Sequence, residues 1–182
     1  MIFTETPIPG AFLLELEERR DERGSFARTF CATDLAAHGL DPHVSQANTS
    51  FNERAGTLRG MHFQAHPFGE AKLVRCTRGA IYDVVVDLRD DSPTRRRWYG
   101  AELTADNGRM LYVPVGLAHG FQTLLDGSEV LYLMSHAYVD GAARGVRWDD
   151  PAFGIEWPEP PVDGRTISQR DAAYPDFQRA PG

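Results

Sequence analysis

Short apolar runs separated by polar breaks dominate this chain. From residue 43 onward the runs recur about every ten residues, each bounded by Gly, Pro, Asn or Asp, which is typical of strands joined by turns. The predicted strands span residues 43–50, 57–63, 71–78, 80–88, 97–104, 109–114, 118–124 and 129–138. The run AIYDVVVD at 80–87 is the most strongly β-forming, so we expect it to be a central buried strand. Because no long helix separates these strands, the pattern predicts an all-β sandwich or barrel of antiparallel strands.

The two ends of the chain carry a weaker pattern. Strands are predicted at 11–16 and 25–30, with a charged turn between them. The segment 33–38 is the best helix candidate, because Thr33 or Asp34 can cap its start and Gly39 can end it. After residue 149 the chain is rich in Pro and aromatic residues. We therefore expect an irregular cover over residues 150–182, with a short helical turn near 168–173.

Length and charge narrow the function classes. The 182 residues, 42% of them hydrophobic, suffice for one globular domain, and we expect the range 1–182 to form it. The formal net charge of −7 disfavours nucleic acid as a partner, because nucleic acid needs a basic face. The start of the chain lacks the pattern of a signal peptide, and no apolar stretch is long enough to span a membrane. We therefore expect a cytoplasmic protein with no membrane partner, in which Cys31 and Cys76 stay unpaired.

Candidate chemistry concentrates in the segment 56–78, GTLRGMHFQAHPFGEAKLVRCTR, which reads as a strand, a polar loop and a second strand. Its chemically active side chains are Arg59, His62, His66, Glu70 and Lys72. Strict alternation along the first strand predicts that Arg59 and Met61 share one face and that His62 lies on the other. A base and a cation close together on adjacent strands suit the removal of a proton next to a carbonyl group.

Lys72 stands out in the composition. It is the only lysine among the 19 basic residues. Lysine is a compact charge that responds to burial, whereas the guanidinium of arginine is planar and always charged. A single lysine between a polar loop and the apolar residues Leu73 and Val74 therefore favours a functional role.

Further side chains extend an acid–base interpretation. Histidine titrates near neutrality, so His62 can act as a base, and either Asp83 or Asp171 can orient it. Tyr132, on the predicted strand 129–138, offers a phenol that can donate a proton from the opposite face. Arginine binds phosphate through paired hydrogen bonds. The candidate phosphate-binding residues are Arg23, Arg59 and Arg170.

Two other interpretations stay open at this point. Eight strands with scattered histidines also suit a metal-dependent cupin, with a turn at 113–116 before the last ligand. The candidate ligands are His62, His66, Glu70 and His119. Gln64 stands where the second histidine of a His-x-His pair is expected, which disfavours a metal. The remaining interpretation is a ligand-binding module on the same scaffold without catalysis, which has no need of a tyrosine opposite a histidine.

A series of stretches carries a resemblance that covers nearly the whole chain. They are DERGSF (21–26), SQANTS (45–50), GTLRGMHFQ (56–64), AKLVRCTRGAIYDVVVDLR (71–89), SPT (92–94), VPVGLAHGF (113–121), EVLYLMSHAY (129–138), RGVRWDDPAFGIEWP (144–158) and ISQRD (167–171). Together and in this order they resemble the nucleotide-sugar epimerases of the dTDP-4-dehydrorhamnose 3,5-epimerase family.

The resemblance implies a fold, an assembly and a reaction. The fold is a cupin-type jelly roll, a double-stranded β-helix with short peripheral helices, and the family needs no metal or other cofactor. The assembly is a homodimer in which the N-terminal strands, roughly residues 1–30, are exchanged between subunits. The substrate is a nucleoside-diphosphate 4-keto-6-deoxyhexose, whose C4 ketone acidifies the protons on C3 and C5, so that either or both centres can be inverted through an enolate.

The resemblance also implies roles for individual residues. His62 would be the base, Asp171 would orient it, and Tyr132 would be the acid. Lys72 would stabilise the enolate oxygen. The implied substrate-binding residues are Arg23 and Arg59 on the diphosphate, Tyr138 on the base, and Gln46, Asn48, Asp83, His119 and Arg170 around the substrate. Three residues depart from the usual family pattern at positions expected near the nucleotide or the cavity rim: Arg28, Leu133 and Ala143.

Overall fold

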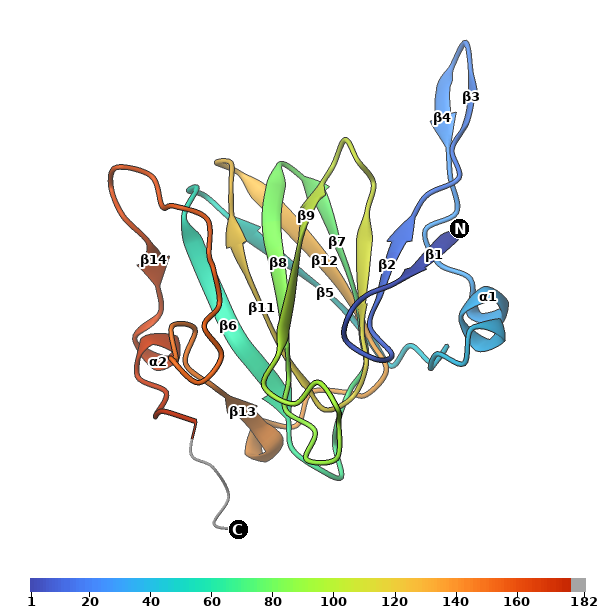
Figure 1. Ribbon diagram of the computed structural model, residues 1–182. Helices are drawn as coiled ribbons and strands as arrows, with labels where there is room; N and C mark the ends of the chain where they lie inside the picture. Colours follow the sequence, from blue (N-terminus) through green and yellow to red (C-terminus); the bar gives the residue numbers. More distant parts are fainter. Residues whose placement is uncertain (178–182) are drawn as a thin grey trace.

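Two β-sheets face each other in the computed structural model, which describes residues 1–177 (Figure 1). The first sheet runs in the order β1 (Ile2–Glu5), β2 (Phe12–Glu15), β10 (Met110–Val113), β7 (Lys72–Arg78), β12 (Ser128–Met134) and β5 (Gln46–Asn52). The second runs in the order β13 (Ala143–Gly145), β6 (Thr57–Gln64), β11 (Leu117–Thr123), β8 (Ala80–Asp87) and β9 (Trp98–Thr104), and β14 (Thr166–Ile167) pairs with β6. This cupin-type all-β jelly roll confirms the predicted fold class.

The main apolar core lies between the two sheets. Val74 on β7 and Leu111 on β10 meet Ile81 and Val85 on β8 and Phe121 on β11, and each is at most 1% exposed. Removing each such side chain from water stabilises the fold by roughly 1.5–3 kcal/mol. Because side chains alternate between the two faces of a strand, these apolar residues lie on the inner face. The resulting alternation of apolar and polar residues is what allowed the strands to be predicted from the sequence.

The predicted strands from residue 43 onward all occur, but some ends differ. β12 ends at Met134, before the predicted end at 138, although Ser135 still bonds Ala71, the residue opposite it just before β7. The segment predicted as a charged turn contains β3 (Arg19–Asp21), which pairs with β4 (Gly24–Phe26). β4 ends at Phe26, so the predicted strand 25–30 is mostly irregular.

The helices are short. α1 (Ala32–Ala37) matches the predicted helix, but the cap residue is Cys31, whose backbone is extended and which makes no side-chain capping bond. The prediction of Thr33 or Asp34 as the cap was therefore wrong. Gly39 lies in the left-handed region, with φ of 71°, and follows the end of the helix as predicted. Within residues 1–177, no helix has the length and apolar character required to cross a membrane.

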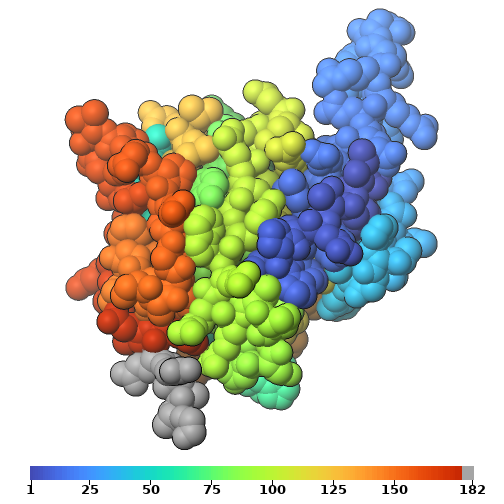
Figure 2. Space-filling model, in the orientation of Figure 1, coloured from blue at the N-terminus to red at the C-terminus, as the bar shows by residue number. Residues whose placement is uncertain are grey.

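The β3–β4 hairpin projects away from the two large sheets (Figures 1 and 2). All six residues of its two strands are exposed, and Phe26 is 73% exposed. An aromatic side chain with this exposure on an isolated hairpin gains little stabilisation from the fold of its own chain.

The segment after residue 149 covers the outer face of the second sheet (Figure 2, orange to red). Phe153 and Trp157 pack against a cluster that includes Met61, Val84 and Ala118. The short helix α2 (Gln169–Ala172) confirms the predicted helical turn and lies beside β6. Apart from β14 and α2, the segment is irregular as far as residue 177, and the predicted remainder of the cover, 178–182, lies outside the described residues.

Candidate active site

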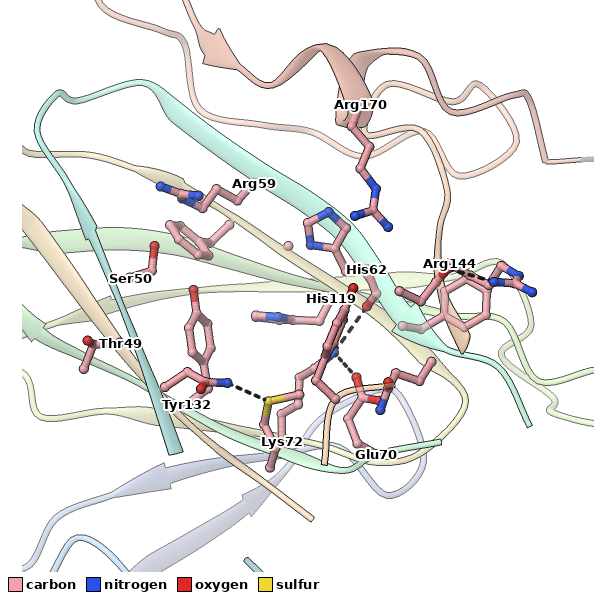
Figure 3. Close-up of a pocket in the computed structure, with 18 of the residues that line it drawn as sticks. Thr49, Ser50, Arg59, His62, Glu70, Lys72, His119, Tyr132, Arg144 and Arg170 are labelled. Atoms are coloured by element: carbon pink, nitrogen blue, oxygen red, sulfur yellow. Dashed lines mark hydrogen bonds and ion pairs between the residues drawn. The ribbon is translucent and has the colours of Figure 1, made fainter. Parts of the chain in front are cut away.

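A cavity of about 570 Å³ opens between the two sheets (Figure 3). The first sheet contributes residues of β5, β7 and β12, and the second contributes residues of β6, β11 and β13. The charged or titratable lining side chains are Arg59, His62, Glu70, Lys72, His119, Tyr132, Tyr138, Arg144 and Arg170. In the described part of the chain, Glu70 is the only carboxylate in this lining, so the cavity suits an anionic ligand.

β6 carries His62, whose Nε2 lies 2.8 Å from Oδ1 of Asp171 on α2. Asp171 is 5% exposed, and its second oxygen accepts a hydrogen bond from the backbone N–H of Gly60 at 3.2 Å. Burial alone would raise the pKa of Asp171, but the hydrogen bond and charge of His62 and the Gly60 N–H outweigh burial and lower it. The carboxylate therefore stays charged and fixes the imidazole, leaving Nδ1 as the nitrogen available to a ligand.

β6 does not alternate strictly, and this changes which residues meet. Phe121 pairs with Arg59 and His119 with His62, so three steps on β6 oppose two steps on β11. This β-bulge turns Arg59 and His62 to the same, cavity-lining side, while Met61 packs into the cluster on the opposite side. The prediction that Arg59 and Met61 share a face was wrong. Gly60 is required at the bulge, because a Cβ there would lie 2.6 Å from the Gly120 Cα.

Tyr132 reaches the cavity from the sheet that faces His62 (Figure 3). It lies on β12, between β7 and β5, and is half-buried against the main core. Burial raises the pKa of Tyr132 to about 12. The hydroxyl is therefore protonated near neutral pH and can donate a proton from the side opposite the imidazole.

Lys72, the first residue of β7, also lines the cavity from the first sheet. Its Nζ lies 2.9 Å from Oε1 of Glu70 and donates to the backbone carbonyl of His62 at 3.3 Å. The side chains of Lys72 and Glu70 are 9% and 3% exposed. A buried ammonium beside a basic imidazole can stabilise negative charge that develops on a ligand oxygen.

His119 on β11 forms a second histidine–carboxylate pair. Its Nε2 lies 2.8 Å from Oδ1 of Asp83 on β8, and its ring lies edge-on to Tyr132, with 6.3 Å between the centroids. Asp83 is fully buried behind His119 and does not line the cavity, so the prediction that it does was wrong. Alternation along β8 turns the Asp83 side chain inward, where it meets the ring that lines the cavity.

The other predicted site residues divide into two groups. Asn48, Tyr138 and Arg170 line the cavity. Gln46 stands behind the lining, where its Oε1 accepts a hydrogen bond from the Tyr138 N–H at 2.9 Å. Arg23 lies at the turn of the β3–β4 hairpin, paired with Asp21 at 2.6 Å, and does not reach the cavity of its own chain.

The structure does not bring the four candidate metal ligands together. His62 pairs with Asp171, Glu70 with Lys72, and His119 with Asp83, while His66 is exposed in the loop after β6. Among residues 1–177, no group of three or more His, Cys, Asp or Glu side chains has an arrangement that can hold a metal ion. The arrangement of the side chains therefore does not favour the metal-dependent alternative.

Sequence reasoning missed several lining residues. They include Ser50, Phe121, Met134 and Arg144. Ser50 follows Asn48 by two positions on β5, so alternation was a usable signal. Of the three departures from the family pattern, Ala143 lines the cavity, whereas Leu133 packs in the apolar cluster behind the first sheet and Arg28 lies beside Asp34. Within one chain, neither Leu133 nor Arg28 lines the cavity, and the expectation that they lie near the nucleotide stays a prediction.

Comparison with known proteins agrees with this geometry. A sequence model of the dTDP-4-dehydrorhamnose 3,5-epimerase family matches residues 5–179. The dTDP-4-dehydrorhamnose 3,5-epimerase of Sinorhizobium fredii is 40% identical over 181 residues, which cover 100% of this chain and 92% of that protein. The crystal structure of the Bacillus anthracis enzyme of the same name, with TDP and PPi bound, is 40% identical, with a TM-score of 0.91 and coverage of 97% and 99%. A 3'-monoepimerase from Streptomyces bikiniensis in complex with dTDP-quinovose is 36% identical, with a TM-score of 0.84 and coverage of 94% and 85%.

The jelly roll, its cavity and these comparisons define an isomerase of the epimerase class. The match spans almost all of the sequence. At 40% identity, it shows membership of the family and not only a shared fold. The chain belongs to the dTDP-4-dehydrorhamnose 3,5-epimerase family.

Proposed function

We propose that this chain epimerises C3, C5 or both in a nucleoside-diphosphate 4-keto-6-deoxyhexose, most simply the dTDP sugar, without a metal or other cofactor. One observation carries the proposal: a histidine held by a carboxylate faces a protonated phenol and a buried ammonium across a single cavity. The relatives with TDP and with dTDP-quinovose bound support the choice of nucleotide.

The chemistry follows from the placement of three groups. The C4 ketone acidifies the neighbouring C–H bonds, and Nδ1 of His62 accepts the proton while Asp171 stabilises the imidazolium. The electron pair moves onto the C4 oxygen, whose negative charge Lys72 stabilises. Tyr132 then returns a proton to the same carbon from the opposite face, which inverts the centre.

Cationic side chains around the cavity would hold the diphosphate. Arg59 and Arg170 line the cavity, and Nε of Arg59 is fixed by Asn52 Oδ1 at 2.8 Å. In our proposal Tyr138, which is 50% exposed, stacks on the nucleotide base, and Gln46 positions it. Asn48 and His119 contact the sugar, and Asp83 acts by holding His119.

Proton exchange with solvent tests the proposed reaction directly. In D2O, the protein is expected to introduce deuterium at C3, C5 or both of dTDP-4-keto-6-deoxyglucose, as followed by NMR of each position. Exchange should persist after treatment with a chelator. Tight binding without exchange at either carbon would contradict the proposal and favour a binding module. Loss of exchange on chelation, restored by one divalent metal, would favour the metal-dependent alternative.

We further propose that the single domain works as a homodimer in which the N-terminal strands are exchanged. The β3–β4 hairpin supports this, because it projects from the two large sheets (Figure 1), Phe26 is 73% exposed and the Arg23 side chain is 83% exposed. In this proposal Arg23 binds the diphosphate in the partner's cavity. Cytoplasmic location is part of the proposal, supported by the free thiols of Cys31 and Cys76.

Mixed dimers distinguish exchange from action within one chain. Arg23→Ala and His62→Gln are each expected to be nearly inactive at substrate concentrations below KM. If Arg23 acts across the dimer, co-expressing the two variants restores one intact site per mixed dimer, measured as recovered turnover. A His62→Gln with Lys72→Met mixture is the matched control, because both changes fall in one chain's own site and no mixed dimer regains activity. If turnover recovers in neither mixture, the proposal that Arg23 acts in the cavity of the partner subunit is wrong.

A further inference from the structure

Glu70 is a buried carboxylate to which the proposed reaction assigns no step. One of its oxygens, Oε1, lies 2.9 Å from Nζ of Lys72. The other, Oε2, is buried and has no hydrogen-bond partner among the described residues. A buried charge that leaves one oxygen unpaired is costly, so the pair needs a reason beyond packing.

Loop anchoring does not supply that reason, because other residues already fix the loop before β7. Gln64 donates to the Phe68 carbonyl at 3.0 Å and accepts from the Val139 N–H at 2.7 Å. Ala71 and Ser135 bond each other through two hydrogen bonds of 2.9 Å. The path of the chain around Glu70 is therefore set without its carboxylate.

The charges around Lys72 are otherwise positive or neutral. The other titratable and charged lining groups are Arg59 and His62 on β6, His119 on β11, Tyr132 on β12, Tyr138 before η1 (Asp140–Ala142), Arg144 on β13 and Arg170 on α2. Asp171 and Asp83 stand behind the two histidines, each within 2.8 Å of the Nε2 atom of its histidine, and neither lines the cavity. Glu70 is the carboxylate in direct contact with the ammonium, and a buried ammonium without such a partner loses its proton more readily.

We propose that Glu70 is the positioning residue for Lys72, keeping the side chain an ammonium ion and fixing its direction. An ammonium has three N–H donors. Glu70 takes one and the His62 carbonyl takes another, which leaves a single donor for a ligand oxygen in the cavity. The inference rests on the proposed function for the part that assigns this last donor to the enolate oxygen.

The sequence itself provides the probe, because Lys72 is the only lysine in the chain. Protein with a lysine-free purification tag and ¹³C at lysine Cε gives one lysine signal, whose chemical shift reports ammonium or amine. Glu70→Gln retains the shape and an acceptor oxygen but removes the charge. Its lysine signal is expected to change from ammonium to amine at lower pH than in the unmodified protein. With dTDP-4-keto-6-deoxyglucose, kcat is expected to fall about tenfold near neutral pH, more at higher pH, with KM within about twofold.

Two further variants keep the test decisive. Glu15→Gln removes the carboxylate of another ion pair, to Arg109 at 2.9 Å outside the cavity, and should move neither the lysine signal nor kcat. Glu70→Asp retains the charge on a shorter side chain, so its lysine signal should titrate as in the unmodified protein while kcat falls. This variant decides the matter if Glu70→Gln does not fold.

The lysine titration needs no substrate, so it is independent of the proposed reaction. If the lysine titration shifts in Glu70→Gln but the unmodified protein never exchanges deuterium, the role of Glu70 in positioning Lys72 is supported and the proposed function is wrong. An unshifted titration in Glu70→Gln, or an unchanged kcat in a protein that does exchange deuterium, overturns the proposal for Glu70.

Discussion

Replacing His62 by glutamine is expected to reduce turnover on the order of 10³-fold. The amide can still donate to Asp171, so the buried carboxylate keeps a partner, but no basic nitrogen faces the cavity. His62 is 45% exposed in its side chain, so the replacement should leave folding nearly unchanged. Turnover and deuterium entry at C3 and C5 should fall together, while dTDP binding measured by calorimetry should change by less than about threefold.

His43→Gln is the matched control for that change. His43 is exposed, bonds Ser45 at 3.1 Å and lies outside the cavity lining, so its replacement should not alter turnover. Asp171→Asn should cost less than loss of the imidazole, because the base remains and only its orientation and charge partner are weakened. Undiminished deuterium exchange in His62→Gln would remove His62 from its role as the base.

Replacing Lys72 by methionine is expected to lower kcat at least 10²-fold and to change KM little. The length of the side chain is kept, but the ammonium is lost, and the negative charge it would stabilise exists only along the reaction path. Steady-state kinetics with the keto-sugar nucleotide measures both constants. A large rise in KM with kcat preserved would instead make Lys72 an anchor for the substrate.

Folding has to be separated from chemistry in this experiment, because Lys72→Met leaves the buried Glu70 without its partner. A double replacement of Glu70 and Lys72 by methionine removes both charges and should be at least as stable as the single variant. It should nevertheless remain as inactive as the single variant. Arg144→Met removes a different cation from the cavity lining and should weaken binding rather than turnover.

Much of the sheet structure could be predicted from the sequence. In a strand with one buried face, apolar and polar residues alternate, and this alternation can be seen in the sequence. The apolar run of β8 predicted a buried strand, and seven of its eight residues are buried. The pairing of Asp171 with His62 could not be derived from spacing, since 109 positions separate them and only the docking of α2 joins them. The residues left Asp83 and Asp171 open as the orienting carboxylate, and the choice of Asp171 depended on the family resemblance.

The errors have local physical causes. The bulge at Gly60 shifts the phase of β6, and no pattern of apolar residues signals an inserted residue, so Arg59 was placed on the wrong face. The charged segment that forms β3 was predicted as a turn. All residues of the β3–β4 hairpin are exposed, so its strands show no alternation of apolar and polar residues that would identify them. Asp83 was placed in the cavity lining because its strand was predicted correctly. The prediction did not include the pairing of His119 with Asp83, which puts the His119 ring between Asp83 and the cavity.

The carboxylate that orients the imidazole comes from a segment that follows every strand of both large sheets. A nascent chain that ends before α2 contains every strand of the two large sheets but lacks the carboxylate that bonds the proposed base. In the proposed mechanism, the orientation of the base would therefore be completed last during biosynthesis, after all the strands have been made. A protease that cuts the chain just before α2 would remove the partner of the His62 imidazole while sparing every strand of the two large sheets.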